Sequence, residues 1–471
     1  MAIKDRQPSG EGQAIEDIPT SPLPAASSPG MAPLPHATPP APKRPRYRAD
    51  RIRMAVVLVL LAILIIAGGL AGLRFLYSGP ALNTSQNQNA PASAGPFVQP
   101  PLNDAQIDAL HRLSSHLKYR QLASLYVSRM TLDEEIGQLI MVEYADEYYS
   151  PDLDNMISNL HAGGVIMYEF QMKTLEQTKH DIAEMQKHAR LPLLVAADEE
   201  GGPYVHRLRN IYPPRMSATD IYNTGDANVA IREGQRVARE LLSLGINVNL
   251  APDVDVQLVP GYDLVTRTFG YSVDSVIKYA GAYMKAMQRN GVIACIKHYP
   301  GLGAASIDAH KALPVINRTK EQLYAVELAP YKYFVQSPDM LERPGMIMPT
   351  DVLMPAIDPV YPAELSRIFM TDILRKEFGY DGVVLTDALY MKGVAINGVQ
   401  IDMAQAAVMA LNAGNDMILG PTGSDQTVAV IQAIKTALQD GKLAKARLDE
   451  AAARIIALKM ERGLMPAVPP S

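Results

Sequence analysis

Short apolar segments alternate with helix-length amphipathic segments along most of this 471-residue chain, beginning near residue 130. Apolar runs bounded by glycine or proline suit strands covered on both faces, and the longer segments have the spacing of amphipathic helices. The strands are expected at Ile136–Val142, Gly164–Tyr168, Leu193–Ala197, Val248–Pro252, Val292–Lys297, Gly345–Met348, Gly382–Thr386 and Asp416–Leu419. The helices are expected at Thr174–Ala189, Ala227–Leu244, Asp274–Arg289, Lys320–Val335, Pro362–Phe378, Ala404–Asn412, Gln426–Asp440 and Leu448–Glu461. This repeat predicts an α/β fold, a (β/α)₈ barrel with a parallel sheet.

Polar residues directly follow one of these strands. Lys297 and His298 come after the apolar run 291–296, and Asp308 and His310 stand a few residues further along the same loop. In α/β barrels the loops that leave the C-terminal ends of the strands line the active site. A carboxylate close to a histidine selects one imidazole tautomer and raises its basicity. A surface pair is the simpler interpretation of Asp308 and His310, so a second feature has to support the catalytic one.

That second feature is Asp387, which ends the apolar run 382–386. An aspartate at the C-terminal end of a barrel strand faces the pocket. It could instead cap the following helix, because aspartate is favoured at helix N-termini. Together with the first loop, its position favours a site.

Several motifs resemble glycoside hydrolase family 3, and in particular its β-N-acetylglucosaminidase branch. Lys297-His-Tyr-Pro-Gly-Leu-Gly303 and Asp308-Ala-His310 are similar to the branch's Lys-His-Phe-Pro-Gly-x-Gly and Asp-Ser-His, and Thr386-Asp-Ala-Leu389 is similar to its nucleophile motif. The resemblance extends to Asp198-Glu-Glu-Gly-Gly202 with Arg207-Leu208, to Ala251-Pro-Asp-Val-Asp-Val256 and to Thr266-Arg-Thr-Phe-Gly270. It covers residues from about 125 to 465 in the same order.

The resemblance implies a retaining glycosidase, which uses a carboxylate nucleophile and a proton donor. Asp387 would be the nucleophile, and His310, oriented by Asp308, would be the acid and base. The resemblance also assigns a set of sugar-binding residues in the −1 subsite: Asp198, Arg207, Arg267, Lys297 and His298. No cofactor and no metal ion is implied. An uncharged histidine base repels an anionic acceptor less than glutamate would, so phosphorolysis stays open.

The chain departs from the family pattern at four places. Leu302 replaces a residue that is often histidine, Ala309 stands where serine is usual, and an extra residue lies between Gly202 and Arg207. Met348-Pro-Thr-Asp351 replaces Met-Pro-Ala-His. A short proline-containing tail follows Glu461, so the second sandwich domain of many family members is expected to be absent. By the resemblance, family 3 β-glucosidases generally place their acid/base carboxylate in that second domain, whereas the β-N-acetylglucosaminidase branch supplies an Asp-His pair from a barrel loop, as this chain does.

Charge and cysteine content exclude other classes of function. The net charge of −5 and the absence of a basic, aromatic patch in the globular part argue against a nucleic-acid partner. The single cysteine, Cys295, lies inside an apolar strand, which indicates a buried hydrophobic residue rather than a nucleophile.

The N-terminal part predicts a membrane anchor. Residues 1–53 are expected to be a disordered tail that ends in a basic run, Lys43 to Arg53. Residues 54–76 contain an uncharged apolar run of about 20 residues, enough to span a bilayer, and are expected to form a membrane helix. The basic run indicates that the tail is cytoplasmic, so the residues after the membrane helix are expected outside. Of these, residues 77–124 are expected to be a spacer and 125–465 the barrel domain. The alternative to an anchor is a cleaved signal peptide, but its apolar core would be shorter and would lie nearer the terminus. The basic run could instead bind anionic lipid.

The sequence therefore predicts a membrane-anchored β-N-acetylglucosaminidase that acts on terminal N-acetylglucosamine of cell-wall or chitin-type glycans. The alternatives are a β-glucosidase or other β-glycosidase of the family, and an inactive, membrane-tethered sugar-binding protein. The natural substrate and the oligomeric state stay open.

Overall fold

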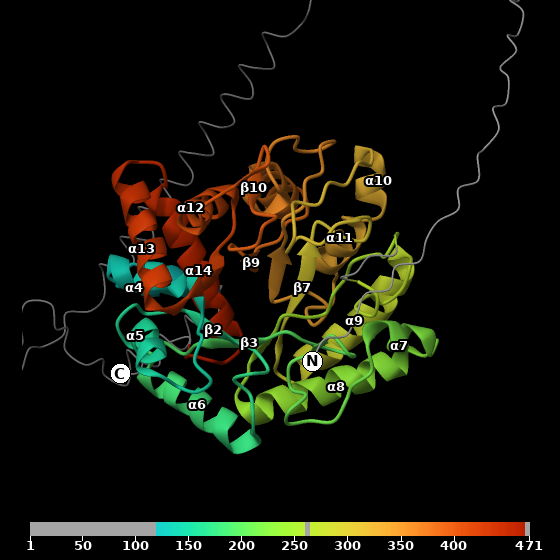
Figure 1. Cartoon of the computed structure of the whole chain (residues 1–471), viewed down its shortest axis with the longest axis horizontal. Helices are drawn as coiled ribbons and strands as arrows, with labels where there is room; N and C mark the ends of the chain where they lie inside the picture. The colour runs from blue at the N-terminus through green and yellow to red at the C-terminus, as the bar shows by residue number, and fades with distance from the viewer. Residues whose placement is uncertain (1–118, 260–263, 467–471) are drawn as a thin grey trace, which may run out of the picture. The chain divides into compact units, whose positions relative to one another are not determined.

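A computed structural model describes residues 119–259 and 264–466. Its centre is a closed barrel of eight strands, drawn as arrows in Figure 1: β1 (Ile140–Glu143), β2 (Gly164–Met167), β3 (Leu194–Ala197), β6 (Val248–Asn249), β7 (Ile293–Tyr299), β8 (Met346–Pro349), β9 (Val383–Ala388) and β12 (Met417–Thr422). The strands follow one another around the barrel in chain order, and β12 closes it against β1. Every neighbouring pair is parallel. The predicted (β/α)₈ barrel is confirmed.

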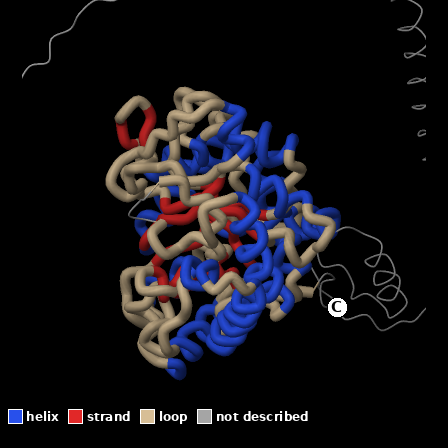
Figure 2. Tube along the Cα trace, turned by 90° about the vertical axis from the view of Figure 1, so that its right-hand side faces the viewer, coloured by secondary structure: helices blue, strands red, loops and turns tan. Residues whose placement is uncertain are grey.

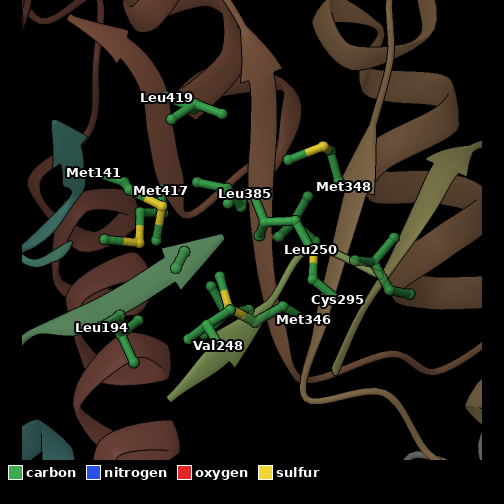
Figure 3. Close-up of a cluster of buried hydrophobic side chains, with 14 of the residues drawn as sticks. Met141, Leu194, Val248, Leu250, Cys295, Met346, Met348, Leu385, Met417 and Leu419 are labelled. Carbon is green, nitrogen blue, oxygen red and sulfur yellow. The ribbon is translucent and has the colours of Figure 1, made fainter. Parts of the chain in front are cut away.

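The strands are buried on both faces, which explains why they are continuous apolar runs rather than alternating ones. Every residue of β7 is buried, including the polar Lys297 and His298 near its end. Side chains from several strands fill the barrel interior, among them Met141, Cys295 and Met417 (Figure 3). Cys295 is buried there, as the sequence predicted.

Helices surround the barrel (Figure 1). The long ones are α6 (Leu175–His188), α8 (Ala227–Leu244), α9 (Val273–Arg289), α12 (Met403–Ala413), α13 (Gly423–Gln439) and α14 (Lys445–Glu461). The apolar stripe of α8, which includes Val237 and Leu241, is buried, and its polar stripe faces solvent. In Figure 2 most of the strands lie inside, and most of the long loops gather on the left-hand side of them.

Two predicted helices are each divided in the structure. The segment expected as Lys320–Val335 forms α10 (Lys320–Ala325) and α11 (Ala329–Gln336), with Pro330 in the first turn of α11. Proline lacks the N–H that a helix interior requires, so the break falls just before it. The segment expected as Pro362–Phe378 forms a 3₁₀ turn, η1 (Ala363–Leu365), and a π-helix, η2 (Ile368–Glu377).

The strand expected at Ile136–Val142 is wrong in its first half. Residues Leu132–Gln138 form helix α4, and only Ile140–Glu143 is strand. A capping box starts α4, because the side chains of Thr131 and Glu134 each accept a hydrogen bond from the other's backbone N–H. The strand expected at Val248–Pro252 is also shorter than predicted.

The sequence interpretation missed the short elements. These are α3 (Tyr119–Val127), α5 (Pro151–Ser158), α7 (Ala218–Asn223), and two hairpins, β4 (Glu199–Gly201) with β5 (Val205–His206) and β10 (Ala395–Ile396) with β11 (Val399–Gln400). Helix α3 packs against α14 and starts ahead of the domain boundary expected at residue 125.

The predicted tail, membrane helix and most of the spacer lie outside the described residues. Within the described residues, no helix is both long and apolar enough to cross a membrane. The membrane helix at 54–76 stays a prediction.

Candidate active site

Polar side chains gather at the C-terminal edge of the barrel, where each parallel strand ends. Glu143 ends β1, Asp198 follows β3, Lys297 and His298 lie near the end of β7, and Asp387 lies near the end of β9. Because the strands are parallel, these residues belong to one rim of the barrel. The sequence had placed four of these five residues in the site.

Lys297 is linked to two other predicted sugar-binding residues, to Asp198 directly and to Arg267 through the carboxylate of Glu200. Its ammonium lies 2.5 Å from Asp198 Oδ1 and 2.7 Å from Glu200 Oε1. Glu200 also accepts two hydrogen bonds from Arg267, at 2.8 and 2.9 Å. Burial alone would lower the pKa of Lys297, but these two carboxylates raise it overall. The network therefore keeps a buried ammonium charged at the rim.

Arg267 also fixes the orientation of His298. Its Nη2 donates to His298 Nε2 at 3.2 Å, so the Nδ1–H of this histidine donates to Asp255 Oδ2 at 2.8 Å. Burial lowers the pKa of His298. Asp253 lies next to Asp255, and burial together with the Asp255 charge raises its pKa well above the usual range. The hydrogen bonds to Asp255 and Arg267 therefore hold His298 as one tautomer, with the proton on Nδ1.

One group of three residues among those described has metal-ligand geometry. Asp253, Asp255 and His298 each offer an atom within 4.8 Å of the others. The Nδ1 of His298 already donates to Asp255, and its other ring nitrogen accepts from Arg267. A cation would have to displace the first bond and lie close to a guanidinium, so the arrangement favours a hydrogen-bonded support for His298 over a metal centre.

Arg207 and Glu143 form a second group at the rim. Arg207 donates to Glu169 at 3.0 Å and lies over the ring of Tyr168, whose hydroxyl donates to Glu143 at 3.0 Å. Glu143 also accepts from Tyr390 at 3.4 Å. Burial raises the pKa of Glu143 to about 7. The charges of Asp198 and Arg207 interact as well, so this group is continuous with the Lys297 network.

Asp387 is partly exposed and is held by hydrogen bonds from three directions. Its Oδ2 accepts from the Thr350 hydroxyl at 3.1 Å, and its Oδ1 accepts from the Ala388 N–H at 2.8 Å. Its own N–H donates to Glu364 Oε2 at 3.2 Å. It does not cap a helix, because Asp387 and Ala388 are still part of strand β9. The carboxylate is fixed at the rim and accessible from solvent.

Asp308 and His310 form the predicted pair on the loop after β7. His310 Nδ1 lies 2.9 Å from Asp308 Oδ1, and the His310 side chain is 70% exposed. The Ala309 carbonyl accepts from Gly393 N–H at 3.0 Å, which ties this loop to the one that follows Asp387. His310 and Asp387 themselves share no hydrogen bond within the described residues. The structure thus brings the two loops together but leaves His310 facing solvent.

The sequence interpretation missed supporting residues. Glu200 lies inside one of the family-like motifs but was given no role, and Thr350 was noted only as a departure from the family pattern. Glu143 ends a strand just as Asp387 does, so the same signal could have identified it. Glu364 had no signal, because its relation to Asp387 exists only in the folded chain.

Residues 131–458 match the glycosyl hydrolase family 3 N-terminal domain. The chain belongs to glycoside hydrolase family 3. The β-hexosaminidase of Idiomarina loihiensis is 33% identical over 285 residues, which cover 59% of this chain and 82% of that protein. The β-hexosaminidase A of Pseudoalteromonas piscicida is 29% identical over 374 residues, which cover 70% of this chain and 61% of that protein.

A solved family 3 structure has the same fold. The β-N-acetylglucosaminidase from a Paenibacillus species superposes with a TM-score of 0.66 at 32% identity, covering 73% of this chain and 65% of that one. The chain therefore spans less than two thirds of two of these three relatives. The family 3 assignment made from the motifs is confirmed, and with it the assignment to the glycoside hydrolases.

Proposed function

We propose that this family 3 protein is a retaining β-N-acetylglucosaminidase that removes terminal N-acetylglucosamine from cell-wall or chitin-type glycans. The observation that carries the proposal is the position of Asp387, a solvent-accessible carboxylate at the rim, held on both oxygens beside the Lys297 network. Retaining hydrolysis needs such a carboxylate to attack the anomeric carbon and form a glycosyl-enzyme ester. The names of the relatives support the choice of N-acetylglucosamine as the sugar.

His310 is the proposed acid and base. Its Nδ1 faces Asp308, which leaves Nε2 as the atom that carries the exchangeable proton. It would donate that proton to the departing oxygen and later remove one from the water that opens the ester. The bond between Ala309 and Gly393 holds this loop next to the loop of Asp387. A modest movement of the exposed His310 side chain toward bound substrate then completes the site.

The proposed sugar-binding residues are Asp198, Arg207, Arg267, Lys297 and His298. Lys297 and Arg267 stay charged because their carboxylate partners outweigh the effect of burial on the pKa of each group. Burial would raise the pKa of Asp198, but Lys297 and Arg207 lower it overall. This rim of the barrel thus offers fixed ionic donors and acceptors to sugar hydroxyls, and these are stronger hydrogen-bonding groups than neutral ones.

We also propose that residues 54–76 anchor the enzyme in the cell membrane with the barrel outside, as the basic run before them indicates. Protease added to the outer face of intact spheroplasts should then remove the barrel and spare the tail. Protection of the barrel would reverse the orientation.

The test of the activity compares the p-nitrophenyl β-glycosides of N-acetylglucosamine and glucose on the purified full chain. We expect faster release from the N-acetylglucosaminide, and a fall of several orders of magnitude in kcat for Asp387→Asn, because no ester can form. Asp425→Asn, an exposed aspartate in the first turn of α13, is the matched control. Preference for the glucoside would indicate a β-glucosidase, and binding without turnover a sugar-binding protein.

A further inference from the structure

The Thr350 hydroxyl contacts the carboxylate of Asp387 directly. Thr350 is 1% exposed and follows the last residue of β8, the strand next to β9. Its backbone N–H donates to the Tyr299 carbonyl at 2.9 Å, and its Oγ1 donates to Asp387 Oδ2 at 3.1 Å. The backbone of Thr350 is thus tied to β7, and its hydroxyl holds the Oδ2 of Asp387 from the end of the neighbouring strand β8.

Two buried carboxyl groups, Asp351 and Glu364, interact electrostatically with the same aspartate. Glu364 Oε2 accepts a hydrogen bond from the Asp387 N–H at 3.2 Å, so a fully buried side chain fixes the backbone of Asp387. Burial and the charges of Asp351 and Asp387 raise the pKa of Glu364 well above its usual range.

Two of these residues, Thr350 and Asp351, depart from the family pattern. Thr350 and Asp351 occupy the positions where the family motif has alanine and histidine. An alanine there has no hydroxyl to donate. Buried carboxyl groups are costly, and a pair of them next to a third carboxylate is more costly still. Asp351 and Glu364 interact electrostatically with each other and with Asp387, which links them to Asp387 rather than to general packing.

We propose that Thr350 and Glu364 are positioning residues that hold the nucleophile Asp387 in its attacking orientation. This rests on the proposed function, in which Asp387 attacks the sugar. Thr350 fixes the carboxylate plane, and Glu364 fixes the backbone of Asp387. Neither group touches the substrate, so their effect falls on kcat rather than on binding.

The experiment compares Thr350→Val with Thr350→Ser in the full chain, using a chromogenic N-acetyl-β-glucosaminide. A hydrogen bond to a charged group contributes about 10- to 150-fold to a rate. We expect Thr350→Val to lower kcat by at least about tenfold, with KM within about twofold. Thr350→Ser restores the hydroxyl and should recover most of kcat. Thr178→Val removes an equally buried hydroxyl, bonded to the Thr174 carbonyl on α6, and is the matched control.

A second pair of variants tests the carboxyl groups. Glu364→Gln keeps an acceptor for the Asp387 N–H, whereas Glu364→Met does not, so kcat should fall further in the methionine variant. The inference is overturned if wild-type protein is active, Asp387→Asn is inactive, and Thr350→Val matches wild type in kcat. If wild type is inactive, or Asp387→Asn retains activity, the proposed function itself fails, and the two failures are distinct.

Discussion

Lys459 on α14 provides a quantitative test of the structure through its effect on stability. Its side chain is 0% exposed, and its ammonium donates a hydrogen bond to Gln138 Oε1 at 2.7 Å. Burial lowers the pKa of Lys459 from 10.5 to about 7. A difference of one in pKa corresponds to about 1.4 kcal/mol, so forcing the charged form into the folded state costs about 5 kcal/mol.

The sign of the pH dependence follows from this lowered pKa. Between pH 7 and 10.5 the unfolded chain binds a proton at Lys459 that the folded chain has lost, so stability rises with pH across this window. From pH 7 to pH 9 this residue should raise the free energy of unfolding by about 2 kcal/mol. Lys459→Met keeps the length of the side chain and removes the charge. It leaves Gln138 Oε1 without this donor, which costs about 1–3 kcal/mol.

We therefore expect Lys459→Met to be more stable than wild type at pH 7 by about 2 kcal/mol, and to lose the rise toward pH 9. Urea unfolding followed by circular dichroism is suitable, since the chain has no tryptophan. Lys442→Met, at a lysine whose side chain is 73% exposed, is the control and should leave the pH dependence unchanged. The same pH dependence in wild type and Lys459→Met would refute the reasoning.

Three further substitutions test the site and the barrel. His310→Ala should slow substrates with poor leaving groups more than a dinitrophenyl glycoside, because a good leaving group needs little protonation, and equal losses of kcat/KM on both would assign His310 to binding. Gly303→Ala should displace the loop after β7 and lower both kcat and the melting temperature, since the added Cβ would lie 1.7 Å from the Val256 carbonyl oxygen; an unchanged melting temperature would contradict the close approach. Asp416 is a buried carboxylate shared by three arginines, which lower its pKa to about 2. Asp416→Ala leaves those arginines without their shared partner and should lower the free energy of unfolding by about 3–5 kcal/mol. A smaller loss in chemical denaturation would mean that the network contributes little to stability.

The strands of the barrel could be predicted because each is a buried apolar run. The strand prediction at 136–142 was wrong in its first half because an apolar run of this length does not distinguish a strand from the end of a helix. The capping box before it starts helix α4, which continues to Gln138. Helix α5 is only eight residues long and carries too little periodicity to be recognised. The break between α10 and α11 did have a signal, Pro330, that the pattern of apolar residues outweighed.

The candidate site was predictable to the extent that its residues follow strands or lie in motifs. Asp387, Lys297 and His298 were found in this way. The partners that fix them were not, because Glu364 is 23 residues from Asp387 in sequence and meets it only through the fold. The exposure of His310 was also beyond the sequence, since it depends on how the loop after β7 lies over the barrel.

The most direct test of the proposed mechanism is to trap the glycosyl-enzyme intermediate. A 5-fluoro-N-acetylglucosaminyl fluoride should inactivate the protein with time, and peptide mass spectrometry should place one sugar on the peptide that contains Asp387. The adduct reports the sugar, the nucleophile and the activity together. A label on a different carboxylate, or turnover of the natural linkage without any covalent label, would contradict the assignment of Asp387 as the nucleophile.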